Sequence, residues 1–252
     1  MAKSSMLVNI TSDNKLASET TDNFSITFGP NIPINGNFGM ALESLSLWYS
    51  WYNISSDYNN TQLRYYNGSA WKNVSITPGL YGVTDINTYL QNQMLANGDF
   101  TTGAGGNIFY ISLTPDYNTF KLQVTVSNSY QLDLSIGNLY LLLGFNPIIV
   151  TSTQQGTNNI NISNGVDRVL VHLDCITGSW LGSSSSDVLY SFSPDGSPSS
   201  LLQIKPYRLI YLPMNRSGYL NSLRVYITDQ QGRRLNLNGE TVSLQLALRK
   251  LG

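Results

Sequence analysis

Residues 220–250 show the clearest strand pattern in this sequence. From 223 to 227, and again from 242 to 248, apolar side chains alternate with mostly polar ones. A two-residue period places each set of side chains on its own face of a β-strand. The pair Asn238-Gly239 lies between the two segments and favours a tight turn. These strands require neighbouring strands beside them and a second layer over their apolar face, which the preceding residues must provide.

The composition restricts what such a protein can bind by charge. The chain has 252 residues, a net charge of -1 and only 12% charged residues, against about 25% in an average protein. This charge is too weak to hold nucleic acid or an anionic membrane without other contacts. Asn, Ser, Thr, Gln and Tyr must therefore form the polar surface, and such a surface suits contacts with other proteins. The 41% hydrophobic content argues against disorder.

The sequence shows no targeting or membrane-spanning segment. Residues 1–20 lack the apolar core of a signal peptide, and no run of ~18 apolar residues occurs. Cys175 is the only cysteine, which rules out an internal disulfide. Eight Asn-x-Ser/Thr sequons are present, but a chain this rich in Asn, Ser and Thr produces sequons by chance, and without a secretion signal we do not expect glycosylation.

Period-two patterns and turn residues predict about ten strands. We expect strands near residues 6–10, 24–28, 38–52, 62–66, 70–76, 108–114, 120–126, 169–175, 187–192, 207–214, 223–228 and 242–249. Gly29-Pro30 is expected to end the second of these. Residues 151–165 are interpreted as a long connection within one domain. The predicted organisation is therefore an N-terminal arm or short strand over 1–22, followed by a single domain over 23–252.

One segment has a helical period. Within 84–95, Ile86, Tyr89, Leu90 and Met94 fall on one face of an amphipathic helix, and Thr84 is the expected N-cap. We expect this helix to lie in a loop between strands and to pack across the end of the sheets. The short apolar segment 139–145 fits either a helical turn or a buried strand, because periodicity cannot separate the two over so few residues.

The segment 38–52 carries aromatic residues on both faces. Leu45, Leu47 and Trp51 belong to the face expected in the core, whereas Trp48 and Tyr52 share the opposite face with small polar residues. A loop of the same chain can cover these two rings, or they can face a neighbouring subunit. Trp and Tyr are enriched in protein interfaces. Trp48 and Tyr52 are accordingly the candidate interface residues.

We found no catalytic constellation in the sequence. His172 is the only histidine, and its expected partner is Asp174 on the same strand, a pair too small for a metal site. Cys175 falls on the apolar face of that strand, where a thiol is inert. The glycine-rich segment 101–107 lacks the lysine and the helix of a phosphate-binding loop. Any aspartate could act as an acid or base, but no motif selects one. We therefore predict no enzyme activity, no cofactor and no bound metal.

Several phrases of the sequence resemble a known family. The phrases are ALESLSLWYSWYNI, PGLYGVTDINTYLQ, LLLGF, VHLDCITGSW, DVLYSF, KPYRLIYLPMN and SLRVYITDQQGRRLNLNGETVSLQLALRK, in that order. They resemble the minor capsid (penton) proteins of polinton-like viruses, virophages and related double-jelly-roll viruses. The resemblance extends from about residue 24 to residue 249, and the segment 151–165 has no counterpart in it.

The resemblance implies a specific fold and a structural role. It implies an all-β, single jelly-roll β-sandwich of two antiparallel sheets, with one short helix and long loops. It also implies homopentamers at the icosahedral vertices of a virion, contacts with neighbouring trimers of the major capsid protein, and no catalytic residues. Two alternatives remain open, another jelly-roll virion component and a carbohydrate-binding jelly-roll domain. The latter requires a shallow aromatic site with Asn and Asp around it.

Overall fold

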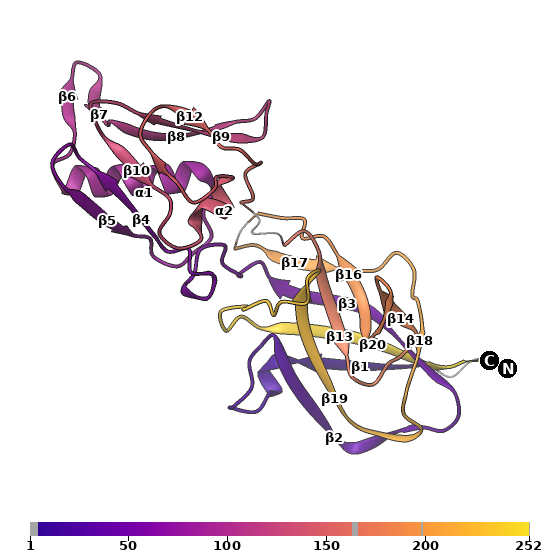
Figure 1. Ribbon diagram of the computed structural model, residues 1–252. Coiled ribbons are helices and arrows are strands. Elements are labelled where there is room, and N and C mark those ends of the chain that lie inside the picture. Colours follow the sequence, from indigo (N-terminus) through magenta and orange to yellow (C-terminus); the bar gives the residue numbers. More distant parts are fainter. Residues whose placement is uncertain (1–4, 163–165, 198, 252) are drawn as a thin grey trace. The chain divides into compact units, whose positions relative to one another are not determined.

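The computed structural model describes residues 5–162, 166–197 and 199–251 (Figure 1). The chain divides into two compact units. Unit 1 consists of Met1–Trp51 and Val166–Gly252, and unit 2 consists of Tyr52–Gly165. Each unit has a hydrophobic core of its own.

Unit 1 is a sandwich of two antiparallel sheets. Its strands are β1 (Ser5–Thr11), β2 (Asn23–Ile34), β3 (Phe38–Trp48), β13 (Val169–Leu173), β14 (Ser179–Leu181), β15 (Ser184–Ser186), β16 (Val188–Phe192), β17 (Leu201–Ile204), β18 (Leu212–Pro213), β19 (Gly218–Asp229) and β20 (Val242–Lys250). Sheet A has the order β1-β20-β3-β17, with β18 also paired to β3, and sheet B has the order β16-β13-β19-β2. The strands β14 and β15 form a separate hairpin.

This strand order is that of a jelly roll. The chain crosses between the sheets after each main strand except β13, which pairs with β16 in the same sheet, and the first strand pairs with the last, from Ser5 opposite Arg249 to Thr11 opposite Ser243. Eight main strands wrapped in this way into two four-stranded antiparallel sheets define the jelly roll. The predicted all-β, jelly-roll fold class is confirmed.

The core of unit 1 lies between the two sheets. The alternating apolar residues of β19 and β20 are all buried in it: Leu223, Val225, Ile227, Val242, Leu244, Leu246 and Leu248. Burying one such side chain contributes roughly 1.5–3 kcal/mol. The C-terminal pattern therefore supplies one strand to each layer, and the predicted core face of both strands is confirmed.

Two strands of unit 1 depart from their predicted bounds. The strand β2 continues through Gly29-Pro30 to Ile34. It is the edge strand of sheet B and pairs only with β19, and an edge strand tolerates proline because one side of its backbone needs no hydrogen-bond partner. The strand β3 ends at Trp48, so the predicted strand over 38–52 is four residues too long.

The segment before the last two strands was also predicted wrongly. Of the expected strand over 207–214, only β18 is a strand. Tyr207, where the expected strand begins, is fully exposed and lies in a loop. The strand β17, which completes sheet A, has only four residues and escaped the sequence pattern.

Unit 2 contains a helix and several short antiparallel sheets. Its elements are β4 (Gln62–Tyr66), β5 (Trp71–Ser75), α1 (Val83–Ala96), β6 (Thr101–Gly103), β7 (Gly106–Ile108), β8 (Ile111–Asp116), β9 (Lys121–Val126), β10 (Gln131–Asp133), α2 (Leu139–Leu143), β11 (Ile149–Val150) and β12 (Gln154–Gln155). The strand orders are β11-β10-β4-β5 and β12-β9-β8, with β6 and β7 forming a hairpin. Single turns of 3-10 helix occur at Ser12–Asn14 in unit 1 and Ser56–Tyr58 in unit 2.

The helix α1 forms the centre of the core of unit 2. Ile86, Leu90 and Met94 are fully buried in a cluster with residues of both larger sheets. The predicted helix is confirmed, but its N-cap is Gly82 rather than Thr84. The backbone N–H of Gly82 donates to Oδ2 of Asp85 at 2.8 Å, which satisfies a free donor at the helix start. The buried residues of the helix belong to the core of unit 2 and not to the core of the jelly roll.

The segment 139–145, for which the sequence allowed a helical turn or a buried strand, contains the short helix α2. Leu139, Leu142 and Leu143 are buried, and Gly144 ends the helix at a φ of 74°. A Cβ at this position would lie 2.5 Å from the backbone oxygen of Asn158, so only glycine fits this C-terminal cap.

The organisation into units differs from the single domain expected over 23–252. The strand β1 lies in the segment 1–22, predicted as an arm or a short strand, and it pairs along its whole length with β20. Residues 52–165 form a core separate from that of the jelly roll. Local strand patterns show which residues face a core, but they do not show which strands share one.

Candidate interaction surface

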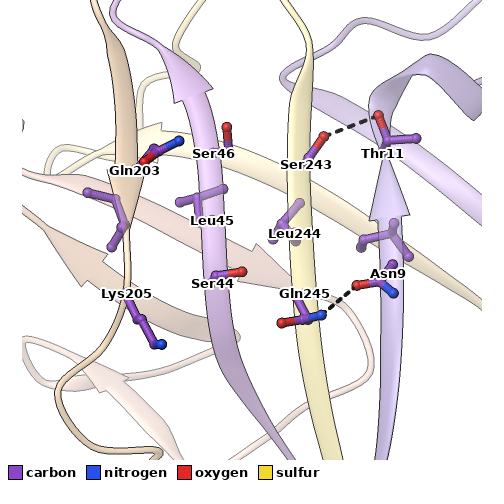
Figure 2. Close-up of a pocket in the computed structure, with 12 residues that line it drawn as sticks. Asn9, Thr11, Ser44, Leu45, Ser46, Gln203, Lys205, Ser243, Leu244 and Gln245 are labelled. Atoms are coloured by element: carbon purple, nitrogen blue, oxygen red, sulfur yellow. Dashed lines mark hydrogen bonds between the residues drawn. The ribbon is translucent and has the colours of Figure 1, made fainter.

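The outer face of sheet A carries a continuous set of uncharged polar side chains (Figure 2). Strand register places Thr11, Ser243, Ser46 and Gln203 in one row across four strands. Asn9, Gln245 and Ser44 form a second row across β1, β20 and β3. Both rows face outwards because the residues between them, such as Leu45 and Leu244, point into the core and side chains alternate along a strand.

This polar surface forms a shallow hollow of about 580 Å³. Gln245 Nε2 donates to Oδ1 of Asn9 at 2.9 Å, and the hydroxyl groups of Ser243 and Thr11 lie 3.5 Å apart. Lys205 is the only charged residue among those lining the hollow. The hydroxyl and amide groups of the hollow can hydrogen-bond to another surface.

The two candidate interface residues both reach solvent but do not share a strand. Trp48 follows Ser44 and Ser46 in alternation at the end of β3 and is 39% exposed. Tyr52 is 37% exposed, lies beyond the end of β3 and is the first residue of unit 2. Their placement in an interface stays a prediction.

The expected pairing of His172 with Asp174 is wrong. His172 Nδ1 lies 2.8 Å from Oδ1 of Asp187, which precedes the neighbouring strand β16. The His172 ring stacks on Tyr226 at 4.3 Å, and the Tyr226 hydroxyl donates to the same carboxylate. Asp174 follows the end of β13 and instead forms an ion pair with Arg216 at 2.5 Å.

The histidine cluster has the chemical order of a catalytic triad but not its accessibility. His172 Nε2 lies 3.0 Å from Oγ1 of Thr228, so a hydroxyl, an imidazole and a carboxylate follow one another. Thr228 is only 3% exposed, and its hydroxyl donates to the backbone oxygen of Asp229 at 3.0 Å. A hydroxyl held in this way cannot reach a substrate, so the cluster joins β13, β16 and β19 instead.

The remaining candidates for chemistry also lie in structural positions. Cys175 is fully buried, and burial raises the pKa of its thiol to about 12, so it stays protonated and unreactive. Burial and the hydrogen bond to Asp187 also raise the pKa of Tyr226. Within residues 5–162, 166–197 and 199–251, no group of three potential metal ligands comes together. In the same ranges, neither helix is long and apolar enough to span a membrane.

Sequence reasoning missed the most exposed aromatic residues. Trp180 in the β14–β15 hairpin is 69% exposed, and Tyr117, Phe120 and Tyr207 are exposed in loops. Strand alternation gives no information on loop residues, because loops follow no period. The only available signal was an aromatic residue within a turn-rich segment.

Comparison with known proteins supports the fold at full length. No family model and no curated protein matches the sequence. The crystal structure of the mavirus penton protein is similar, with a TM-score of 0.51 and 10% sequence identity. The match covers 98% of this chain and 100% of that protein. This chain has the penton-protein fold. The resemblance inferred from the sequence is thereby confirmed at the level of the fold.

Proposed function

We propose that this protein is a structural capsid protein, a penton that occupies the icosahedral vertices of a virion. The observation that carries the proposal is the fold match, because it extends over the jelly roll and over unit 2 alike. A jelly roll alone occurs in many unrelated proteins. A match that includes both the jelly roll and the unit inserted into it fits far fewer protein families than a match to a jelly roll alone.

The surface composition is consistent with an assembly of identical subunits. Five subunits around a five-fold axis require a heterologous interface, in which one patch meets a different patch of the next subunit. Only 12% of the residues are charged, and charged residues are depleted in the cores of protein interfaces. We propose that Trp48 and Tyr52 contribute to this interface, and that other surfaces contact trimers of the major capsid protein, first in the infected cell and then in the virion.

The mass of the purified full-length chain tests the proposal. Five chains of 27.9 kDa give a particle of about 140 kDa, which mass photometry distinguishes from smaller species, and negative-stain images should show five-fold rings. Stable trimers or other rings would favour a different virion component. A monomer at every concentration, which also fails to join vertices when co-expressed with the major capsid protein, would contradict the proposal.

The double variant Trp48→Ala/Tyr52→Ala tests the predicted interface residues. An interface hot spot contributes about 2 kcal/mol, so each loss weakens association roughly 30-fold. Light scattering should therefore show dissociation of the five-subunit particle at concentrations where the wild type stays assembled. Trp180→Ala is the matched control, because it removes an exposed tryptophan from another part of unit 1. If the double variant folds and its particle keeps the wild-type mass, these residues are not in the interface.

A further inference from the structure

Unit 2 contains a groove that the proposed capsid role does not use. The groove has a volume of about 400 Å³, within the range of small-ligand sites. It lies between the start of α1, the turn that joins β8 to β9, and the segment around residue 160. Its lining consists of Gly82, Val83, Thr84, Asp85, Pro115, Asp116, Tyr117, Phe120, Ile160 and Ile162.

Two aromatic residues that line this groove, Tyr117 and Phe120, are largely exposed to solvent. Tyr117 is 79% exposed and Phe120 is 67% exposed. Phe120 also has a φ of 56°, a left-handed conformation that is unfavourable for a bulky side chain. The backbone N–H of Ile160 donates to the oxygen of Phe120 at 2.9 Å, which ties the turn to the opposite wall. An exposed ring at a strained position adds nothing to the core, so a contact outside the chain is the better explanation.

Two carboxylates among the lining residues of the groove, Asp85 and Asp116, are hydrogen-bond acceptors. Asp116 accepts from the Thr119 hydroxyl at 2.8 Å, from the Asn118 N–H and from Gln155 Nε2. These hydrogen bonds, that of Thr119 first, hold the pKa of Asp116 below its ordinary value, so it carries a full negative charge at neutral pH. Asp85 is the second carboxylate that lines the groove, and its Oδ2 accepts from the backbone N–H of Gly82.

The ligand must therefore have an apolar face and hydroxyl groups at its edge. Val83, Ile160 and Ile162 provide an apolar floor, Tyr117 and Phe120 provide flat rings, and the carboxylates accept hydrogen bonds from O–H groups. A sugar ring has such a face and such an edge. Two carboxylates repel an anionic ligand, which argues against sialylated or sulfated sugars.

We propose that this groove of unit 2 binds a neutral pyranose of a glycan. The aromatic rings stack on the apolar face of the sugar, and Asp116 and Asp85 accept hydrogen bonds from its hydroxyl groups. A monosaccharide has few atoms, and each contributes little binding energy, so the expected Kd is on the order of 1 mM. All the lining residues belong to one chain, so the proposal can be tested on the purified protein.

The test uses the full-length chain and defined probes. Saturation-transfer NMR is run with neutral, sialylated and sulfated oligosaccharides, and with choline as a cationic probe for the aromatic rings. We expect binding of neutral sugars alone. Lack of binding to every neutral sugar, a preference for the anionic sugars, or tighter binding of choline would each overturn the proposal.

Two variants place the binding in the groove. Tyr117→Ala should weaken sugar binding at least about 10-fold, whereas Tyr207→Ala, which removes an even more exposed tyrosine from unit 1, should leave it unchanged. Phe120→Gly should weaken binding and raise the unfolding temperature, because glycine adopts a positive φ without strain. Unchanged sugar binding in Tyr117→Ala, or a lower unfolding temperature in Phe120→Gly, would assign these rings a role within the chain instead.

Discussion

The two units of this protein are assembled from the chain in opposite ways. Unit 1 requires both ends of the chain, because β1 pairs with β20 across almost the entire sequence. Unit 2 is a continuous segment, and its β4–β5, β6–β7 and β8–β9 hairpins join neighbours in sequence. Contacts between distant residues form slowly, because the chain must first close a long loop. We therefore expect unit 2 to fold before unit 1 and independently of it.

Unit 2 is one continuous segment, so the jelly roll accommodates its 114 residues within a single connection. The insertion lies in the connection between β3 and β13, which crosses from sheet A to sheet B. Trp51 and Val166 flank it, and both are buried in the core of unit 1. The jelly roll thus fixes both ends of the connection with its own contacts, and a connection of this kind tolerates insertion.

Deleting residues 1–11 should have the largest effect on stability. The deletion removes β1, its pairing with β20 and the buried side chain of Ile10. We expect the loss to exceed about 5 kcal/mol, the lower end of the stability of a typical domain. Unit 1 should unfold while unit 2 keeps its protection in hydrogen exchange followed by mass spectrometry.

Cys175 provides the measurement for unit 1. Its thiol is buried, and its pKa is raised to about 12, so a thiol reagent reacts only when unit 1 opens. Deletion of residues 1–4 is the control, because it leaves all of β1 in place. Full protection of Cys175 in the chain that lacks residues 1–11 would show that unit 1 does not depend on its non-local strand.

An intermediate effect is expected from Arg64→Ala in unit 2. Arg64 Nε donates to Oδ2 of Asp133 at 2.8 Å, and the Asp133 carboxylate is fully buried. Removing the partner of a buried charge costs about 3–5 kcal/mol, but Arg64 is itself 37% exposed, so we expect about 2 kcal/mol. Hydrogen exchange should show weaker protection of β4 and β10, with unit 1 unchanged.

The stability of unit 2 should depend on pH differently in Arg64→Ala and in the wild type. Burial raises the pKa of Asp133, but hydrogen bonds from Ser135 and Arg64 together outweigh it and lower the pKa below the ordinary value. The wild-type carboxylate therefore stabilises unit 2 at neutral pH, and this contribution is lost only as the pH falls below about 4. In Arg64→Ala the Ser135 hydrogen bonds remain but the lowering by Arg64 is lost, so the pKa of Asp133 should rise and unit 2 should lose less stability than the wild type as the pH falls below about 4. A parallel pH profile in both proteins would contradict this account.

The sequence predicted features that depend on neighbours along one strand or helix. The alternation in β19 and β20 and the helical face of α1 were read correctly, because periodicity follows directly from backbone geometry. The partner of His172 was read wrongly, because Asp174 is near in sequence whereas Asp187 is near in space. The groove of unit 2 escaped for the same reason, since three segments far apart in the sequence form it.

The smallest effect is expected from removing unit 2 altogether. If the jelly roll fixes both ends of its own connection, a short Gly/Ser linker in place of residues 52–165 should leave unit 1 folded. Closing a connection about ten times shorter costs roughly 2 kcal/mol less entropy, so the excision should not destabilise unit 1. Cys175 should stay protected from the thiol reagent, and the isolated segment 52–165 should show the hydrogen-exchange protection that it has in the full chain. Exposure of Cys175 after the excision would mean that the jelly roll needs the inserted unit for its stability, and that the two units are not independent.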